Sequence, residues 1–415
     1  MFSKYLYKHK NRRFINDWNN AISDQHQIQE QLPIIKPYHQ EYVTPNLSQT
    51  AISQIPPQYF SGVQLKKLYN VPTVIPATPT TKKTTIAIII AYHYPGVKKD
   101  LEIYWKNLIN FGPDSIPPVI NIYTMPGATQ NSGWAKEECL DVQMVCTMNP
   151  NANIWIVEAK SVNLTDLLAA LNYSRTTIKA DIVSMSWGTN EAPSLTKYNS
   201  FFTDTSACYC VSSGDTNTVS WPATTPNCIA VGGTTLLWNP NITPDRTEYA
   251  WDSGGCGYSS IFKQPAYQSN ISSIIHTNRA IPDVSLIADM NTCVYSVYNG
   301  NWYGIGGTSV SAPIFAGILS LANQMRFNLG KNGLTTVTGT NSTISTNIQT
   351  YLYKTIYPNP VSYKSMFYDV SGGSNKGSVT GSTILKTYDT SCGFDIPTGL
   401  GSPNATNLCN GLVTI

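Results

Sequence analysis

Residues 84–91 form a continuous apolar run, Thr-Thr-Ile-Ala-Ile-Ile-Ile-Ala, that is rich in isoleucine. A strand with one face in water alternates apolar and polar residues, whereas a strand covered on both faces is apolar throughout. The run therefore predicts a central strand of a parallel sheet that has helices on both of its faces.

Shorter apolar runs and helical patterns follow this segment along the chain. Strands alternating with helices are typical of a parallel sheet with right-handed connections, in which ligands bind at the carboxyl ends of the strands. We therefore predict an α/β fold with a central, mostly parallel sheet over residues 56–415. Residues 1–55 lack a sustained period and are interpreted as an N-terminal arm or lead-in. The further strands are predicted at 154–157, 180–186, 207–212 and 228–231, and the helices at 62–69, 101–111 and 164–173.

The strongest local pattern is the glycine-rich segment 306–317, Gly-Gly-Thr-Ser-Val-Ser-Ala-Pro-Ile-Phe-Ala-Gly. Glycines before a serine let the backbone turn sharply and expose the hydroxyl of Ser309 at the start of a helix. The free N–H groups at a helix start can stabilise a developing oxyanion. The pattern favours Ser309 as a nucleophile, and a glycine turn that only caps a helix is the alternative.

A nucleophilic serine requires a base, and the usual pairing of Asp with His is missing from this sequence. The first predicted strand leads to His93 without an Asp-Ser/Thr-Gly motif, and His-Gly-Thr does not occur. The helical pattern around 134–144 instead carries Glu137 and Asp141 on one face, four residues apart. Two carboxylates this close share a proton, which raises one pKa and suits a base that works in acid. Glu138 with Asp141 is an alternative pair, and acids at such spacings are also common on solvated helix faces.

A third acid follows the predicted strand 207–212 in the turn Ser-Ser-Gly-Asp, which ends at Asp215. The turn places Asp215 at the carboxyl edge of the sheet, where a protonated carboxyl group can donate a hydrogen bond to an oxyanion. Ordinary turn chemistry explains an Asp at this position equally well.

Taken in order, these motifs resemble those of the sedolisin family, the serine-carboxyl peptidases. The Glu137-x-x-Leu-Asp141 helix resembles the family's Glu/Asp motif, Ser212-Ser-Gly-Asp215 its oxyanion segment, and residues 307–313 its nucleophile motif. The resemblance extends over 59–403 and implies a subtilisin-like fold. It implies Glu137 as base, Asp141 as its partner, Asp215 as oxyanion donor and Ser309 as nucleophile. Lesser matches lie at 150–154, 183–188, 222–224, 231–234, 248–251, 265–268 and 282–285.

The resemblance also implies one structural calcium ion near the C-terminus. Its ligands would be the carboxylates of Asp369 and Asp395 and the main-chain carbonyls of Val370, Ser391 and Gly393. Oxygen ligands of this kind suit calcium. The alternative is two acidic residues in turns that hold no ion.

Three departures from the family pattern bear on these expectations. Ser391 stands where the family usually has glycine, and Cys256 lies in a stretch that the family usually builds of glycines. We also expect the long prodomain of the family to be missing, because residues 1–55 are too short for one.

The resemblance implies a peptidase, either an endopeptidase or a tripeptidyl-peptidase, and the acid pair suits activity at acidic pH. Only 12% of the residues are charged, against a usual share of about 25%, so few ion pairs are lost in acid. We expect a protein or peptide substrate, a monomer, no nucleic acid and no membrane span, in an acidic, extracellular or particle-associated compartment rather than the cytosol. A neutral hydrolase that uses His93 and a non-catalytic binding module are the competing hypotheses.

Overall fold

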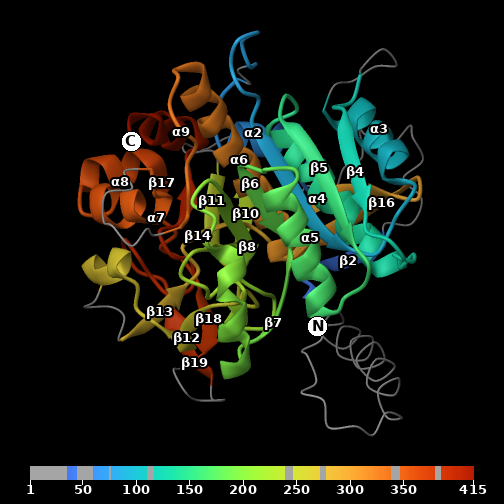
Figure 1. Cartoon of the computed structure of the whole chain (residues 1–415). Coiled ribbons are helices and arrows are strands. Elements are labelled where there is room, and N and C mark those ends of the chain that lie inside the picture. The colour runs from blue at the N-terminus through green and yellow to red at the C-terminus, as the bar shows by residue number, and fades with distance from the viewer. Residues whose placement is uncertain are drawn as a thin grey trace, which may run out of the picture. The chain divides into compact units, whose positions relative to one another are not determined.

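The computed structural model describes residues 35–43, 59–73, 76–109, 116–238, 246–271, 277–337, 346–378 and 385–415. These residues belong to one compact unit, Ile34–Ile415. The fold is built around one large sheet (Figure 1).

Within the described residues the large sheet has eight strands, and all its neighbouring pairs run parallel except β10 with β11. Every residue of the central strand β3 is buried, which confirms the prediction from its apolar run. The order is β11 (Arg246–Ala250), β10 (Ile229–Trp238), β8 (Cys208–Ser212), β6 (Ile182–Met185), β3 (Thr85–Ala91), β5 (Asn153–Ala159) and β4 (Ile120–Thr124), and β14 (Val284–Ile287) also pairs with β10.

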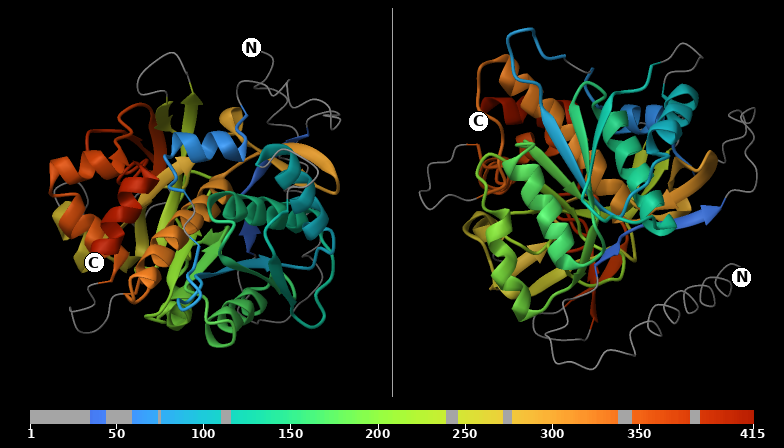
Figure 2. Two further views of the ribbon diagram at one scale, coloured as in Figure 1. Left: turned by 90° about the horizontal axis from the view of Figure 1, so that it is seen from above. Right: turned by 45° about the vertical axis from the view of Figure 1, so that its right-hand side comes forward.

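Helices cover both faces of this sheet (Figures 1 and 2). The helix α5 (Leu164–Thr176) packs on one face, against β3 and β5. The helices α4 (Ser132–Met148) and α6 (Thr308–Asn328) pack against each other and against the other face. The helix α2 (Gly62–Leu68) packs on α4, and α9 (Ala405–Thr414) packs on α6. None of the helices in the described part of the chain is long and apolar enough to cross a membrane.

Smaller sheets surround this core. One contains β13 (Asn278–Ile281), β12 (Gly257–Lys263), β18 (Ser374–Ser378) and β19 (Leu385–Asp389), and another β15 (Val294–Tyr298), β16 (Asn301–Gly306) and β2 (Gln40–Val43). A third contains β1 (Lys36–Pro37), β7 (Trp187–Asn190) and β9 (Ser220–Trp221), and β17 (Phe367–Tyr368) pairs with β20 (Ser402–Pro403). Further helices are α3 (Val97–Leu108), α7 (Ile348–Thr350) and α8 (Pro360–Met366).

The predicted strands and helices all occur, with bounds that differ by a few residues. The helix predicted at 101–111 begins earlier, at Val97, and residues 110–115 lie outside the described part. Strand β4 was not predicted, because its half-buried sequence Ile-Asn-Ile-Tyr-Thr lacks a continuous apolar run. The region from 235 to 307, in which no strand or helix was predicted, contains six strands among its described residues. Two segments of the predicted arm, β1 and β2, pair with strands of the fold.

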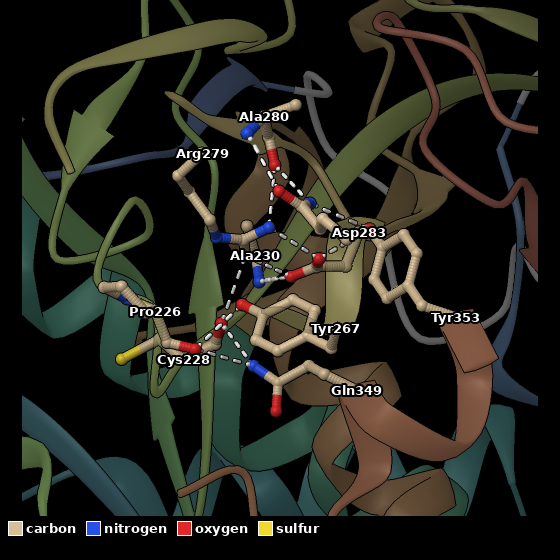
Figure 3. A network of polar contacts seen from close by, with 10 residues as sticks. Pro226, Cys228, Ala230, Tyr267, Arg279, Ala280, Asp283, Gln349 and Tyr353 are labelled. Carbon is tan, nitrogen blue, oxygen red and sulfur yellow. Dashed lines mark hydrogen bonds and ion pairs between the residues drawn. The ribbon is translucent and has the colours of Figure 1, made fainter. Parts of the chain in front are cut away.

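A buried ion pair ties three parts of the fold together (Figure 3). Arg279 and Asp283 have no exposed surface, and two hydrogen bonds of 2.8 and 2.5 Å join them. Asp283 also accepts bonds from the Ala230 N–H at 2.9 Å and from the Tyr353 hydroxyl at 2.7 Å. Arg279 donates in addition to the Cys228 carbonyl at 3.3 Å. The network fixes β14 beside β10, which places the following segments that lead to α6.

Candidate active site

The helix α4 carries the two acids of the proposed proton pair. Its N-cap residue Asn131 accepts a 3.1 Å bond from Trp134 N–H, which fixes the start of the helix two turns before Asp141. Glu137 and Asp141 are both fully buried. Burial, followed by the negative charge of Glu137, raises the pKa of Asp141 well above its usual value. The two carboxyl groups are therefore close enough to influence each other's protonation, as their spacing on the helix predicts.

Each of these acids has one oxygen in a hydrogen bond and one without a partner. Asp141 Oδ1 accepts a 2.6 Å bond from the hydroxyl of Ser186, which follows β6. Glu137 Oε2 contacts Nδ1 of His39. Within the described residues, Glu137 Oε1 and Asp141 Oδ2 are buried and have no hydrogen-bonding partner. Because an unpaired buried oxygen is costly when ionised, this arrangement favours a proton held by the pair.

Ser309 lies in the first turn of α6, where the glycine-rich segment places it. Its hydroxyl donates a 3.2 Å bond to the main-chain carbonyl of Ser186, and its N–H donates a 2.9 Å bond to the carbonyl of Tyr38. Ser186 thus contacts the nucleophile through its main chain and Asp141 through its side chain. Gly307 precedes this turn with a φ of +108°, a left-handed conformation that favours glycine.

Asp215 lies on the other side of the nucleophile turn. Its Oδ1 accepts bonds from the N–H of Thr308 at 2.9 Å and from the Thr308 hydroxyl at 2.8 Å. Its Oδ2 is buried and unpaired within the described residues. Burial raises the pKa of Asp215 to about 7, opposed by the bonds from Thr308 and assisted by the charge of Glu137. Below that pH the carboxyl group is neutral and able to donate a hydrogen bond from Oδ2.

Gly307 brings Asp215 to the same point as the Tyr38 carbonyl. A Cβ atom built on Gly307 would lie 2.4 Å from Tyr38 O and 2.6 Å from Asp215 Oδ2. The carbonyl oxygen that accepts a bond from the Ser309 N–H and the unpaired oxygen of Asp215 thus both approach one point at Gly307. A main-chain N–H and a protonated carboxyl group that reach one carbonyl oxygen are the kind of donors that an oxyanion site requires.

Two other candidates from the sequence lie at a separate place. Glu138 is buried, and its pKa is raised by that burial and then by the charge of Glu158, with which it also shares a hydrogen bond. His93 Nδ1 lies 3.0 and 2.8 Å from the two carboxyl oxygens of Glu158, at the end of β5. The structure therefore brings Glu138 and His93 to Glu158, and not to Ser309.

The five residues expected to bind calcium lie in two neighbouring turns. Asp369 accepts bonds of 3.0 Å from the Gly393 N–H to both carboxyl oxygens, and Asp395 accepts a 3.1 Å bond from the N–H of Ser391. Burial, and to a smaller extent Asp369, raise the pKa of Asp395 to about 7. In the described part of the chain neither carboxylate pairs with a cationic side chain. Carboxylate and carbonyl oxygens are the ligand types that calcium prefers, and the two acids have no cationic partner that would compete with the ion. Among the described residues, however, no group of three or more acidic, His or Cys side chains comes together as a metal site. The expected carbonyls of Val370, Ser391 and Gly393 would have to supply the remaining ligands.

Four residues of the site were not identified from the sequence as functional. Ser186 lies in the segment 183–188, which was noted only as a lesser match, and Thr308 was considered only as part of the nucleophile motif. Tyr38 and His39 come from the predicted arm, where no pattern marks them. Their positions depend on long-range strand pairing, which a single sequence does not display.

Three comparisons relate the chain to known proteins. The model of the subtilase family matches residues 125–376. Sedolisin from Pseudomonas sp. (strain 101) is 27% identical over 80% of this chain and 58% of its own length. Kumamolisin from Bacillus sp. (strain MN-32) is 29% identical over 72% of this chain and 55% of its own length. The chain thus spans little more than half the length of these curated relatives.

A solved structure shares the fold. The structure of Pseudomonas sedolisin, a serine-carboxyl proteinase complexed with two molecules of pseudo-iodotyrostatin, superposes with a TM-score of 0.68 at 23% sequence identity. The match covers 86% of this chain and 98% of that one. The fold is therefore the predicted subtilisin-like α/β architecture.

Proposed function

This chain belongs to the subtilase family, and within it to the sedolisins, and we propose that it hydrolyses peptide bonds at acidic pH with Ser309 as nucleophile. The observation that carries the proposal is the connection through Ser186, which contacts the hydroxyl of Ser309 and the carboxylate of Asp141. It connects the acid pair to the buried hydroxyl of Ser309 at the N-terminus of α6.

In the first step, the hydroxyl oxygen of Ser309 attacks the carbonyl carbon of a bound peptide, and Glu137 takes the hydroxyl proton. Asp141 shares the charge of Glu137, since burial and that charge raise the pKa of Asp141. Asp141, with its raised pKa, holds a proton in the range where ordinary carboxylates are ionised, which suits acid conditions. Proton transfer requires the Ser309 hydroxyl to rotate from the Ser186 carbonyl towards Glu137.

The negative charge on the carbonyl oxygen is stabilised by two donors. One is the N–H of Ser309, which already donates to a carbonyl. The other is the protonated carboxyl group of Asp215, whose pKa of about 7 keeps it neutral in acid. Donors fixed in place before the reaction contribute about 2.7–4 kcal/mol each to the transition state in such sites.

The reaction then divides into two halves. Glu137 returns its proton to the leaving amide nitrogen, the C–N bond breaks, and an ester with Ser309 remains. Water hydrolyses this ester with Glu137 again acting as base. The same pair of acids thus serves both halves, first as base and then as acid.

We also propose that one calcium ion bound by Asp369, Val370, Ser391, Gly393 and Asp395 stabilises the C-terminal turns. The ion would supply positive charge between the two carboxylates. It would take no part in the reaction, because these residues contact neither Ser309 nor Glu137 in the described structure. Its role is therefore structural.

Peptide-library digestion between about pH 3 and 7 tests the proposal. We expect cleavage that rises towards acid and is lost in Ser309→Ala and in Glu137→Gln. The matched control is His93→Ala, which should retain most of the activity because His93 pairs with Glu158. Loss of activity in His93→Ala with a rate maximum near pH 8 would favour the neutral hydrolase. Failure of a peptide aldehyde to label Ser309 at pH 4, together with no cleavage, would favour the non-catalytic module.

A further inference from the structure

A second group of buried acids lies next to the pair that carries the proposed reaction. Glu138 directly follows Glu137 on α4 and lies three residues before Asp141, so that Glu138 and Asp141 are neighbours on the helix. Glu158, near the end of β5, shares a hydrogen bond with Glu138. Glu138 is 1% exposed, and Glu158 has no exposed surface. The proposed reaction uses neither acid, although burying two acids together is costly unless their charge is compensated.

Glu158 is surrounded by hydrogen-bond donors. Its Oε1 accepts a 3.0 Å bond from the N–H of Tyr94, and its Oε2 accepts a bond from the hydroxyl of Thr124 at the end of β4. Nδ1 of His93 lies 3.0 and 2.8 Å from the two oxygens. The side chain of His93 is 32% exposed, so water can take its place. With donors at both oxygens, Glu158 accepts hydrogen bonds as an ionised carboxylate does.

The bond between Glu138 and Glu158 requires a proton. Two ionised carboxylates can only accept hydrogen bonds, so one of the two groups must be protonated. Since donors already face both oxygens of Glu158, the proton belongs to Glu138, which donates to Glu158. Burial, followed by the charge of Glu158 and the bond to it, raises the pKa of Glu138 well above its usual value. Oε1 of Glu138 is buried without a partner among the described residues, which suits an uncharged group.

The surroundings of Glu138 offer no positive charge. Besides Glu158 on β5, the titratable groups that face it are Asp141 and Cys139 on α4 itself, and Cys139 in turn contacts Asp100 on α3. None of these groups can become a cation, and Glu138 forms no ion pair within the described residues. An ionised Glu138 would therefore place an uncompensated negative charge beside Asp141.

We propose that Glu138 and Glu158 hold one proton between them, and that this second pair keeps negative charge away from Asp141 so that Glu137 can act as a base in acid. This assignment rests on the proposed peptidase function and adds two positioning residues to it. A charged Glu138 would make Glu137 and Asp141 bind protons more tightly. Glu137 would then be neutral, and unable to act as a base, in the acid range where the reaction is proposed to run.

The experiment measures kcat between about pH 2 and 7 for a peptide that the wild-type enzyme cleaves, and compares the midpoints of the acidic limb. Glu158→Gln replaces an accepting oxygen with an N–H donor, to which an ionised Glu138 can bind. We expect Glu138 to lose its proton in this variant, and the acidic limb to move to higher pH by about one unit. The midpoint does not depend on the fraction of enzyme that is folded. An unchanged midpoint would overturn the proposal.

Glu138→Gln supplies the matched rescue. Added to Glu158→Gln, it removes the group that would ionise, so the double variant should have the wild-type midpoint. A limb that stays shifted in the double variant would show that Glu158→Gln acts by distorting the site. Glu138→Gln alone keeps a donor to Glu158 and should not move the limb. A move to lower pH in that variant would show that Glu138 is charged in the wild type, which contradicts the proposal.

A third variant covers the case in which Glu158→Gln does not fold. Thr124→Val removes one donor to Glu158 without changing a charge. The proton should then move partly from Glu138 to Glu158, and the acidic limb should shift in the same direction by a smaller amount. A folded Thr124→Val enzyme with the wild-type midpoint would count against the shared proton.

These results also separate the second pair from the proposed function. If peptides are hydrolysed in acid but no variant at Glu138, Glu158 or Thr124 moves the limb, the function stands and the role of the second pair is wrong. If the wild-type chain hydrolyses no peptide and an aldehyde does not label Ser309, both are wrong.

Discussion

The hydroxyl of Ser186 donates a 2.6 Å hydrogen bond to the buried carboxylate of Asp141. The same residue accepts a bond from Ser309 through its main-chain carbonyl. Its side chain can therefore be removed without loss of its contact with the nucleophile, which makes the acid pair accessible to a separate test.

Ser186→Ala should lower the rate of peptide hydrolysis about tenfold and move the acidic limb of the rate profile to higher pH. The bond from Ser186 lowers the pKa of Asp141, so its removal raises that pKa further. It also leaves a buried oxygen unpaired, at a cost of about 1–3 kcal/mol. The measurement is kcat as a function of pH. The control is Ser184→Ala on β6, which ends one residue before Ser186, because the Ser184 hydroxyl is buried without a partner among the described residues. Equal effects of the two changes would contradict the assignment.

Asp215 sets the alkaline limit of the reaction in our proposal. Its pKa is raised to about 7, so the donor is protonated in acid and lost as the pH rises through about 7. Asp215→Asn supplies an amide donor that does not titrate, and it should remove this limb of the kcat profile. An alkaline limb that stays in place in the variant would rule out Asp215 as its source.

The same raised pKa makes a prediction about stability. The folded protein binds the Asp215 proton more tightly than the unfolded chain, so the free energy of unfolding should decrease as the pH rises from about 4 to about 7. Asp215→Asn should flatten that part of the curve, measured by urea denaturation in the inactive Ser309→Ala background. The exposed Asp252→Asn serves as the matched control and should leave the slope unchanged.

Calcium should raise the melting temperature near pH 7 and have less effect near pH 4. Asp395 has its pKa raised to about 7, so it is protonated in acid, where a cation competes with a proton for the carboxyl group. A chelator should reverse the effect, and Asp395→Asn should abolish it. A melting temperature that ignores both calcium and chelator at neutral pH would refute a calcium site in these turns.

The ion pair between Arg279 and Asp283 should contribute strongly to stability. Asp283→Ala leaves a buried guanidinium without its partner, and we expect a loss of about 3–5 kcal/mol in the free energy of unfolding. The surface pair of Lys106 with Glu102 on α3 is the comparison, and Glu102→Ala should cost far less, because solvent screens an exposed pair. Similar losses of unfolding free energy from the two changes would show that burial does not determine how much the Arg279–Asp283 pair contributes to stability.

The central strands of the fold could be predicted from the sequence because the patterns that indicate them lie within single segments of the chain. Residues 84–91 are apolar throughout, and β3 is buried throughout. Strand β4 escaped prediction because an edge strand needs no such run. The pairing of β1 and β2 was missed because it joins residues more than a hundred positions apart.

The site shows the same division. Glu137 and Asp141 could be placed on one face from helix geometry alone, and Ser309 from the glycines before it. Ser186 contacts Ser309 through its main-chain carbonyl, which any residue type possesses, and its side-chain bond to Asp141 joins residues 45 positions apart that meet only in the folded chain. Tyr38 and His39 could not be identified from the sequence, because their contacts with Ser309 and Glu137 arise only in the folded chain.

The bare α-carbon of Gly307 has a consequence for how this site discriminates. A single methyl group there would lie 2.4 Å from the carbonyl oxygen of Tyr38 and 2.6 Å from Oδ2 of Asp215. A methyl group at this position would occupy the space of the peptide oxygen on which negative charge develops in the proposed reaction. Ser309, Glu137 and Asp141 would all be retained. The absence of a side chain at Gly307 thus sets the size of the space that is available to that oxygen.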